Sequence, residues 1–207
     1  MKDHFINSDT KSLIGGWYSD QLQVCDDIIS NFHDKRNNIG TDNNPILTDR
    51  TKKYNGYNSM SSLDIGNDIM SQYLNKILKP TLHLYKQQYP YCSDKILEWK
   101  LDYDFNIQHY PPNYSYSVWH CENNGEFNTS KTRRHLVFMT YLNTIAVDGY
   151  TSFYHQGVNI KPEKGLTLIW PAHWTHMHKG IPAPNEDKYI ITGWYCFVTP
   201  RNISEFL

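Results

Sequence analysis

The sequence lacks the features that would divide the chain, anchor it in a membrane or attach it to nucleic acid. None of its 207 residues lie in an apolar run that approaches the roughly 20 needed for a membrane span. The stretch at 1–7 lacks the apolar segment typical of a signal peptide, so we expect a cytoplasmic protein. Without linkers or repeats, the chain predicts a single domain over 1–207. A net charge of −1 argues against a broad nucleic-acid-binding surface.

Cysteine is scarce and scattered. Cys25, Cys92, Cys121 and Cys196 form no CxxC pair, so we expect free thiols rather than disulfides or a structural zinc site. Aromatic residues are abundant instead, with 16 Tyr and 6 Trp, and such side chains favour β-structure.

The first half of the chain predicts helices. Apolar residues recur at helical spacing after Ser19 and Asp20, which are candidate N-caps. A polar stretch at 37–60 predicts a long loop. A second helical pattern follows it, and Pro80 should kink or end that helix. We expect these supporting helices to span about 19–90.

After residue 95 the pattern changes to short strands separated by turn signals. The strand candidates are 96–110, 114–122, 135–142, 151–155, 158–161, 166–170 and 189–198. Helices followed by many strands predict a mainly β fold with flanking helices. We expect a jelly roll (a double-stranded β-helix, cupin-like) at about 95–199, with the N-terminal helices packed on one sheet and a pocket between the sheets.

A possible metal-binding pair lies at His120 and Glu122. On a β-strand, residues i and i+2 point the same way, so both side chains could reach one ion while Cys121 points elsewhere. A carboxylate beside a histidine on one strand face is costly unless it is paired or metal-bound. Two histidines and one carboxylate, with open positions opposite, are the ligands of non-haem Fe(II) oxygenases. A second histidine must then come from a distant strand.

The residues alone leave that second histidine open. His176 and His178 share one strand face, and His173 is near. The three could instead form a zinc site, but the His-x-Glu pair would then have no role. Lys188 begins an apolar, strand-like run. A lysine that points inward there needs an anion, which suits an acidic co-substrate.

Together these residues resemble the Fe(II)- and 2-oxoglutarate-dependent dioxygenases, within the prolyl 4-hydroxylase-like group, over most of 13–198. The motif at 120–122 resembles the start of the family's His-x-Asp/Glu…His triad, with Glu where Asp is commoner. A Pro four residues and a basic residue ten residues after the distal histidine favour His178, because Pro182 and Lys188 fit. The wording Trp-Thr-His-x-His-x-Gly is similar to small viral and phage members.

Further pieces follow in the family's order. They are Tyr110, an Arg…Tyr-Leu-Asn strand at 134–143, Gly-x-Thr-x-Phe at 149–153, Lys-Pro-x-x-Gly at 161–165 and Lys-Tyr-x-Ile-Thr-x-Trp at 188–194. Each piece is weak alone, and their shared order and spacing make the resemblance strong.

The resemblance implies a set of residue roles. Fe(II) would be held by His120, Glu122 and His178, with 2-oxoglutarate and O2 as co-substrates and ascorbate as an additional cofactor. The residues expected at the far carboxylate of 2-oxoglutarate are Lys188, Tyr110, Tyr141 and Thr151. The candidate substrate residues are Arg134, for which a surface ion pair is equally weighted, and Trp194, which should pack beside the pocket.

The implied reaction is hydroxylation of an unactivated C–H bond, first of all on a prolyl residue of a peptide or protein, with succinate and CO2 as co-products. Two alternatives remain. One is a cupin-like protein that binds a metal or ligand without oxidation. The other is a nucleic-acid oxidative demethylase of the same superfamily, which the balanced charge disfavours. The sequence carries no signal for an oligomeric state.

Overall fold

Short antiparallel strands make up the second half of the chain, and helices precede them. The computed structural model describes residues 1–4, 12–38, 58–93, 98–123, 125 and 130–198. The helices are α1 (Leu22–Asn38), α2 (Asn67–Tyr73) and α3 (Lys79–Gln88), with a π-helical segment at Leu74–Leu78 and 3₁₀ turns at Ser62–Asp64, Pro90–Cys92, Ser130–Arg133 and Trp174–His176. Within the described ranges, no helix combines the length and apolar character that crossing a membrane requires.

The strands form two sheets. The larger contains β1 (Lys2–Asp3), β2 (Gly15–Tyr18), β3 (Asn58–Ser61), β4 (Trp99–Leu101), β5 (Asn106–Tyr110), β6 (Arg134–Tyr141), β9 (Leu166–Pro171) and β11 (Lys188–Phe197). The smaller contains β7 (Thr151–Phe153), β8 (Val158–Ile160) and β10 (His178–Gly180). The larger sheet has the order β1-β2-β9-β6-β11-β5-β3, with β4 beside β11, and the smaller has the order β10-β7-β8.

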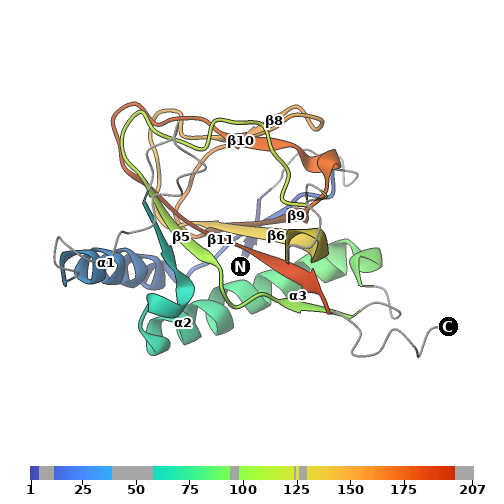
Figure 1. Cartoon of the computed structure of the whole chain (residues 1–207), viewed down its shortest axis with the longest axis horizontal. Helices are drawn as coiled ribbons and strands as arrows, with labels where there is room; N and C mark the ends of the chain where they lie inside the picture. Colours follow the sequence, from blue (N-terminus) through green and yellow to red (C-terminus); the bar gives the residue numbers. More distant parts are fainter. Residues whose placement is uncertain (5–11, 39–57, 94–97, 124, 126–129, 199–207) are drawn as a thin grey trace.

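The two sheets face each other, and the three helices cover the outer side of the larger sheet (Figure 1). This arrangement confirms the predicted fold: mainly β with flanking helices, a jelly roll with the N-terminal helices on one sheet. Strand alternation on β11 divides the core. Tyr189, Ile191 and Tyr195 pack towards the helices, whereas Ile190 and Trp194 pack between the sheets.

The first helix follows the predicted pattern. Ser19 Oγ accepts a hydrogen bond from the backbone N–H of Gln21 just before α1 begins, and Cys25, Ile28 and Phe32 are buried at helical spacing. All four cysteines are free thiols, as expected.

Of the two effects predicted for Pro80, a kink or an end of the helix, the structure excludes the end. It lies in the first turn of α3, directly after the π-helical segment at Leu74–Leu78. The backbone N–H of Lys79 donates to the carbonyl of Leu74, five residues back. The wider π turn accommodates the proline ring, so the helix continues where an α-helix would break.

Two other segments differ from expectation. The predicted strand at 114–122 is absent, and only His120 forms a bridge, with His178. Alternating side chains alone cannot make a strand when no neighbouring backbone is in register over that length. Of the loop predicted at 37–60, residues 58–60 lie in β3, and 39–57 lie outside the described residues.

The backbone of Gly193 lies close to the side chains of Phe105 and Phe138, so this position tests the packing. A Cβ at that position would collide with Phe105 Cβ and meet Phe138 Cζ at 2.6 Å. Gly193→Ala should therefore lower the free energy of unfolding by about 1–3 kcal/mol through overpacking. Gly66→Ala is the matched control, because its Cβ would meet nothing closer than 3.8 Å. Thermal unfolding checks both, and equal stability of the two variants would contradict the packing described here.

Candidate metal centre

A cavity of about 420 Å³ lies between the two sheets. Side chains from both sheets and from the loop that precedes β6 line it, and they include His120, Glu122, His178 and Lys188. The lining is mixed polar and apolar, which is typical of a ligand pocket rather than of a packed core.

Three of the predicted site residues converge in this cavity. His120 Nε2 lies 3.4 Å from Glu122 Oε1, and His178 Nε2 lies 3.7 Å from the same oxygen. One ligand atom from each residue lies within 4.8 Å of the other two. Ligand atoms bound to one ion at roughly 2.1 Å lie about 3–3.5 Å apart, so the three residues need only small shifts to share a metal.

Backbone carbonyls fix the tautomer of both imidazoles. His120 Nδ1 lies 2.8 Å from the carbonyl of Val118, and His178 Nδ1 lies 2.9 Å from that of His176. A carbonyl can only accept, so each Nδ1 carries a proton, and in the neutral ring each Nε2 presents a lone pair. In that form, two lone pairs and a carboxylate oxygen face one another. That is the donor set of a cation site, with the outer hydrogen bonds that metal-binding histidines use.

The electrostatics favour the metal-binding forms. Burial alone would raise the pKa of Glu122, but its hydrogen bonds and charge interactions with His120 and His178 hold it well below the ordinary value. Burial lowers the pKa of His120. A carboxylate and neutral imidazoles are the forms that bind divalent metals.

His176 and His173 are not part of this group. His176 Nε2 lies 3.0 Å from the carbonyl of Ser12, and its Nδ1 lies 2.9 Å from Thr175 Oγ1. Its ring is therefore held on the far side of the segment from His178. His173 is exposed. The structure thus brings His178, and not His176, to Glu122.

Lys188 is buried on the cavity wall. Its side chain is 4% exposed, and Nζ donates to the carbonyl of Gly149 at 3.1 Å and lies 5.1 Å from the ring centre of Tyr110. In the described part of the chain, no carboxylate pairs with it. Burial lowers the pKa of Lys188 to about 8. A buried ammonium without an anion is costly, so the cavity favours an acidic ligand there.

The three predicted hydroxyl groups differ in what they can offer that ligand. Tyr110 donates to Gln108 Oε1 at 2.6 Å, and Tyr141 donates to Thr151 Oγ1 at 2.7 Å. Among the described residues, no acceptor is found for the hydroxyl proton of Thr151. Thr151 is therefore the hydroxyl that is ready to donate to a ligand near Lys188.

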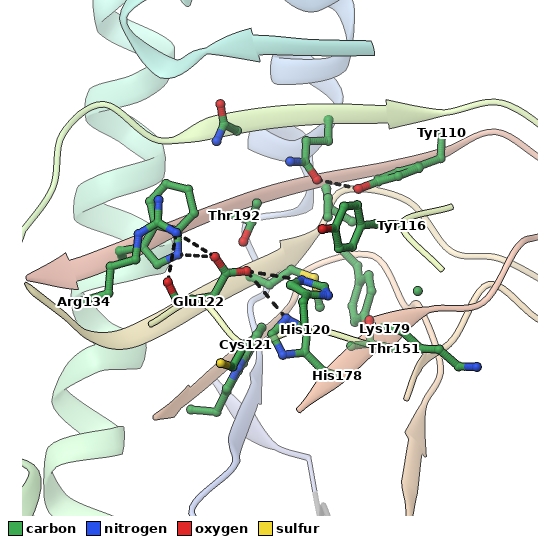
Figure 2. A pocket seen from close by; sticks show the side chains of 18 of the residues that line it. Tyr110, Tyr116, His120, Cys121, Glu122, Arg134, Thr151, His178, Lys179 and Thr192 are labelled. Atoms are coloured by element: carbon green, nitrogen blue, oxygen red, sulfur yellow. Dashed lines mark hydrogen bonds and ion pairs between the residues drawn. The ribbon is translucent and has the colours of Figure 1, made fainter. Parts of the chain in front are cut away.

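Arg134 and Trp194, the candidate substrate residues, both line the cavity but direct their polar groups at Glu122. Arg134 Nη1 donates to Glu122 Oε2 at 2.9 Å, and Trp194 Nε1 donates to the same oxygen at 3.0 Å. Figure 2 shows Glu122 between Arg134 on one side and the two histidines on the other. The surface ion pair considered for Arg134 is wrong, since its side chain is 13% exposed.

Sequence reasoning missed several other polar residues of the cavity wall, and Gln108 and Trp170 are two of them. Gln108 shares a strand face with Tyr110, so alternation on β5 could have placed it there. Trp170 gave no such signal, because β9 is buried on both faces. Its Nε1–H is buried without an acceptor among the described residues. An unpaired buried donor on a cavity wall suits an oxygen-bearing ligand.

The fold and this donor set define a class: a jelly-roll protein with the two-histidine, one-carboxylate site typical of non-haem Fe(II) oxygenases. Comparison with known proteins agrees. Residues 105–196 match the model of the 2OG-Fe(II) oxygenase superfamily. The predicted resemblance to its prolyl 4-hydroxylase-like members is confirmed. No curated protein matches the chain.

Three prolyl hydroxylases are among the solved structures with a similar fold. The viral collagen prolyl hydroxylase of Paramecium bursaria Chlorella virus 1, solved with 2OG, is 15% identical with a TM-score of 0.63, covering 90% of this chain and 97% of that one. A Pseudomonas putida prolyl-4-hydroxylase is 18% identical with a TM-score of 0.57, covering 92% and 97%. A Trichoplax adhaerens prolyl hydroxylase, solved with a hypoxia inducible factor peptide fragment, is 17% identical with a TM-score of 0.61, covering 89% and 84%.

The two histidines of the 176–178 segment can be separated by metal binding. His178→Gln should abolish stoichiometric binding of Fe(II) or Co(II), because it removes an Nε2 donor that faces Glu122. His176→Gln should keep metal binding and lose only stability, about 1 kcal/mol for its hydrogen bond to Ser12. Anaerobic equilibrium dialysis with metal analysis measures both. Retained binding in the first variant with loss in the second would move the ligand to His176.

Proposed function

We propose that this protein hydroxylates a prolyl residue of a peptide or protein, consuming 2-oxoglutarate and O2 on Fe(II) and releasing succinate and CO2. The observation that carries the proposal is the buried Lys188, which has no carboxylate partner among the described residues and shares one cavity with His120, Glu122 and His178. A metal site alone would suit many reactions. A metal site beside a buried cation suits a co-substrate that chelates at one end and carries an acid at the other.

His120, Glu122 and His178 would hold the Fe(II). When bound, iron with 2-oxoglutarate and O2 supplies the oxidising power for hydroxylation of a C–H bond. The three side chains would supply three ligands to the metal and leave its other positions to small ligands. Their Nδ1 hydrogen bonds to the carbonyls of Val118 and His176 fix both rings before any metal arrives.

Lys188 and Thr151 would bind the far carboxylate of 2-oxoglutarate. Lys188 supplies the charge, and Thr151 supplies a hydroxyl whose oxygen already accepts from Tyr141. The donated bond from Tyr141 polarises the Thr151 hydroxyl and strengthens it as a donor. A buried ion pair needs such extra hydrogen bonds to offset the desolvation of both charges.

The similar solved structures support a prolyl substrate. The three similar structures described above are prolyl hydroxylases, one of them solved with a peptide fragment. Loops commonly carry the residues that set substrate specificity on such scaffolds. Ascorbate remains an additional cofactor in the proposal.

Turnover of 2-oxoglutarate tests the proposed reaction. The purified chain with Fe(II), O2 and 2-oxoglutarate should form succinate slowly on its own and faster with a proline-containing peptide that it accepts. The accepted peptide should gain the mass of one oxygen atom, in proportion to the succinate formed. Glu122→Ala is the control that should lose both signals. Absence of any succinate from the iron-loaded wild-type protein would contradict the function.

A charge-removing substitution tests the role of Lys188. Lys188→Met should weaken anaerobic 2-oxoglutarate binding about 10- to 100-fold, the effect of losing a charge-assisted hydrogen bond worth about 1.5–3 kcal/mol. Iron affinity should stay unchanged. The visible charge-transfer band of the ternary complex measures binding, and Lys161→Met, at an exposed lysine, is the matched control.

The pH dependence gives this prediction a second signature. The free protein holds Lys188 at a pKa of about 8, and only the ammonium pairs with a carboxylate. Raising the pH through 8 removes that proton, so the 2-oxoglutarate affinity of the wild type should fall about tenfold between pH 7 and pH 9. The affinity of Lys188→Met should be flat over that range. A wild-type affinity that rises with pH would remove Lys188 from the binding site.

A further inference from the structure

The outer oxygen of Glu122 is more fully bonded than the inner one. Oε2 accepts from Arg134 Nη1 at 2.9 Å and from Trp194 Nε1 at 3.0 Å. The same guanidinium nitrogen donates to the backbone carbonyl of Glu122 at 3.2 Å, and the backbone N–H of Glu122 donates to Ala172 at 3.1 Å. Both ends of the residue are therefore anchored. Oε1 alone faces His120 and His178.

Arg134 and Trp194 also hold each other. The guanidinium carbon of Arg134 lies 3.4 Å from the centre of the Trp194 ring. Stacking of this kind fixes the plane of the guanidinium, so less freedom is lost when it binds the carboxylate. Arg134, Trp194 and the Oε2 oxygen thus form a closed group, in which each member contacts the other two.

A β-bulge is what aims Arg134 at this group. On β6 and β11, Leu136 pairs with Tyr195, and the next pair is Arg134 with Cys196, so His135 is passed over. Paired residues of antiparallel strands point to the same face, and Cys196 shares its face with Trp194. Without the bulge, His135 would occupy that face. Bulges next to active sites commonly re-aim a side chain in this way.

His135 occupies the opposite face, as the bulge requires. Its Nε2 lies 2.8 Å from the carbonyl of Cys92, and its ring packs on Trp99 and Phe197. Trp99 packs against the helix-side core cluster. The effect of the bulge is therefore seen on both faces of the sheet: Arg134 lies on the cavity face and His135 on the helix face.

We infer that Arg134 and Trp194 are positioning residues that clamp Oε2 of Glu122, so that Glu122 binds the metal through Oε1 alone. The inference rests on the proposed function, because it concerns how that metal is held. It replaces the expectation that these two residues contact substrate. We call the pair the Glu122 clamp.

The clamp restricts a freedom of movement that a glutamate ligand has and an aspartate ligand would lack. Glutamate has one more rotatable bond, so its carboxylate has more freedom to rotate or to bind with both oxygens. Two donors on Oε2 remove that freedom before the metal arrives. They also spread part of the negative charge away from the metal, which is how outer hydrogen bonds tune a ligand.

Metal binding by two conservative variants tests the clamp. Trp194→Phe keeps the ring and removes the Nε1 donor, and Arg134→Met keeps bulk and removes the guanidinium. Each should weaken Co(II) binding by about 10- to 100-fold, as expected for loss of an outer-shell partner. Each should also change the visible absorption band of bound Co(II), because a freed carboxylate alters the coordination number.

Two matched controls separate the clamp from general damage. Arg133→Met removes the neighbouring exposed guanidinium, and Trp174→Phe removes the indole of a residue that is 67% exposed. Both should keep the Co(II) affinity and the spectrum of the wild type. Thermal unfolding of each apo variant shows whether it is folded.

The outcomes distinguish the clamp from the proposed function. If both clamp variants fold and bind Co(II) with the affinity and spectrum of the wild type, the clamp is overturned and the metal centre stands. A wild type that binds no Co(II) overturns the metal centre and the clamp with it. If both variants fail to fold, the indole N–H of Trp194 is followed in ¹⁵N-Trp-labelled wild type. Hydrogen exchange much slower than that of Trp174 supports the clamp, and equally fast exchange overturns it.

Discussion

Two reciprocal backbone hydrogen bonds between His120 and His178 hold the candidate metal centre together. The N–H of His120 donates to the carbonyl of His178 at 3.0 Å, and the N–H of His178 donates back at 2.9 Å. They tie an irregular loop to β10 of the smaller sheet. As a result, the ring centres of His120 and His178 are 4.2 Å apart. Directly opposed residues of an antiparallel pair point to one face, so this single bridge aligns both imidazoles on the cavity.

The larger sheet supplies further polar side chains of the cavity, among them Lys188 and Trp194. Strand β11 carries Lys188 at its start and Trp194 near its end, and alternation directs both into the cavity while Tyr189 and Tyr195 pack against the helices. One strand thus carries the proposed co-substrate site at one end and contacts the outer oxygen of Glu122 near the other. The helices stiffen this strand from behind. Rigid elements hold reactive geometry better than loops do, which is why the helical layer matters for the site.

In the part of the chain that the structure describes, buried charge in the cavity is paired at Glu122 but not at Lys188. Glu122 faces two imidazoles on one side and Arg134 on the other. Among the described residues, the partners found for Lys188 are neutral: the carbonyl of Gly149 and the ring of Tyr110. The unbalanced charge is therefore positive and sits where an acidic ligand is proposed to bind. A site built in this way is strained without its ligands, because buried charge is stable only when it is paired.

Local patterns in the sequence determined the helix positions, most strands, the His-x-Glu pair and the inward lysine, because period and spacing are local properties. The continued helix at Pro80 and the absent strand before His120 depended on a π turn and on missing strand partners, which no local pattern records. Only the tertiary structure placed His178, and not His176, beside Glu122, because the ring of His176 contacts the carbonyl of the distant Ser12. It also decided the orientation of Arg134, since the bulge at His135 changes the face on which Arg134 lies, and pairing register is a property of two strands together.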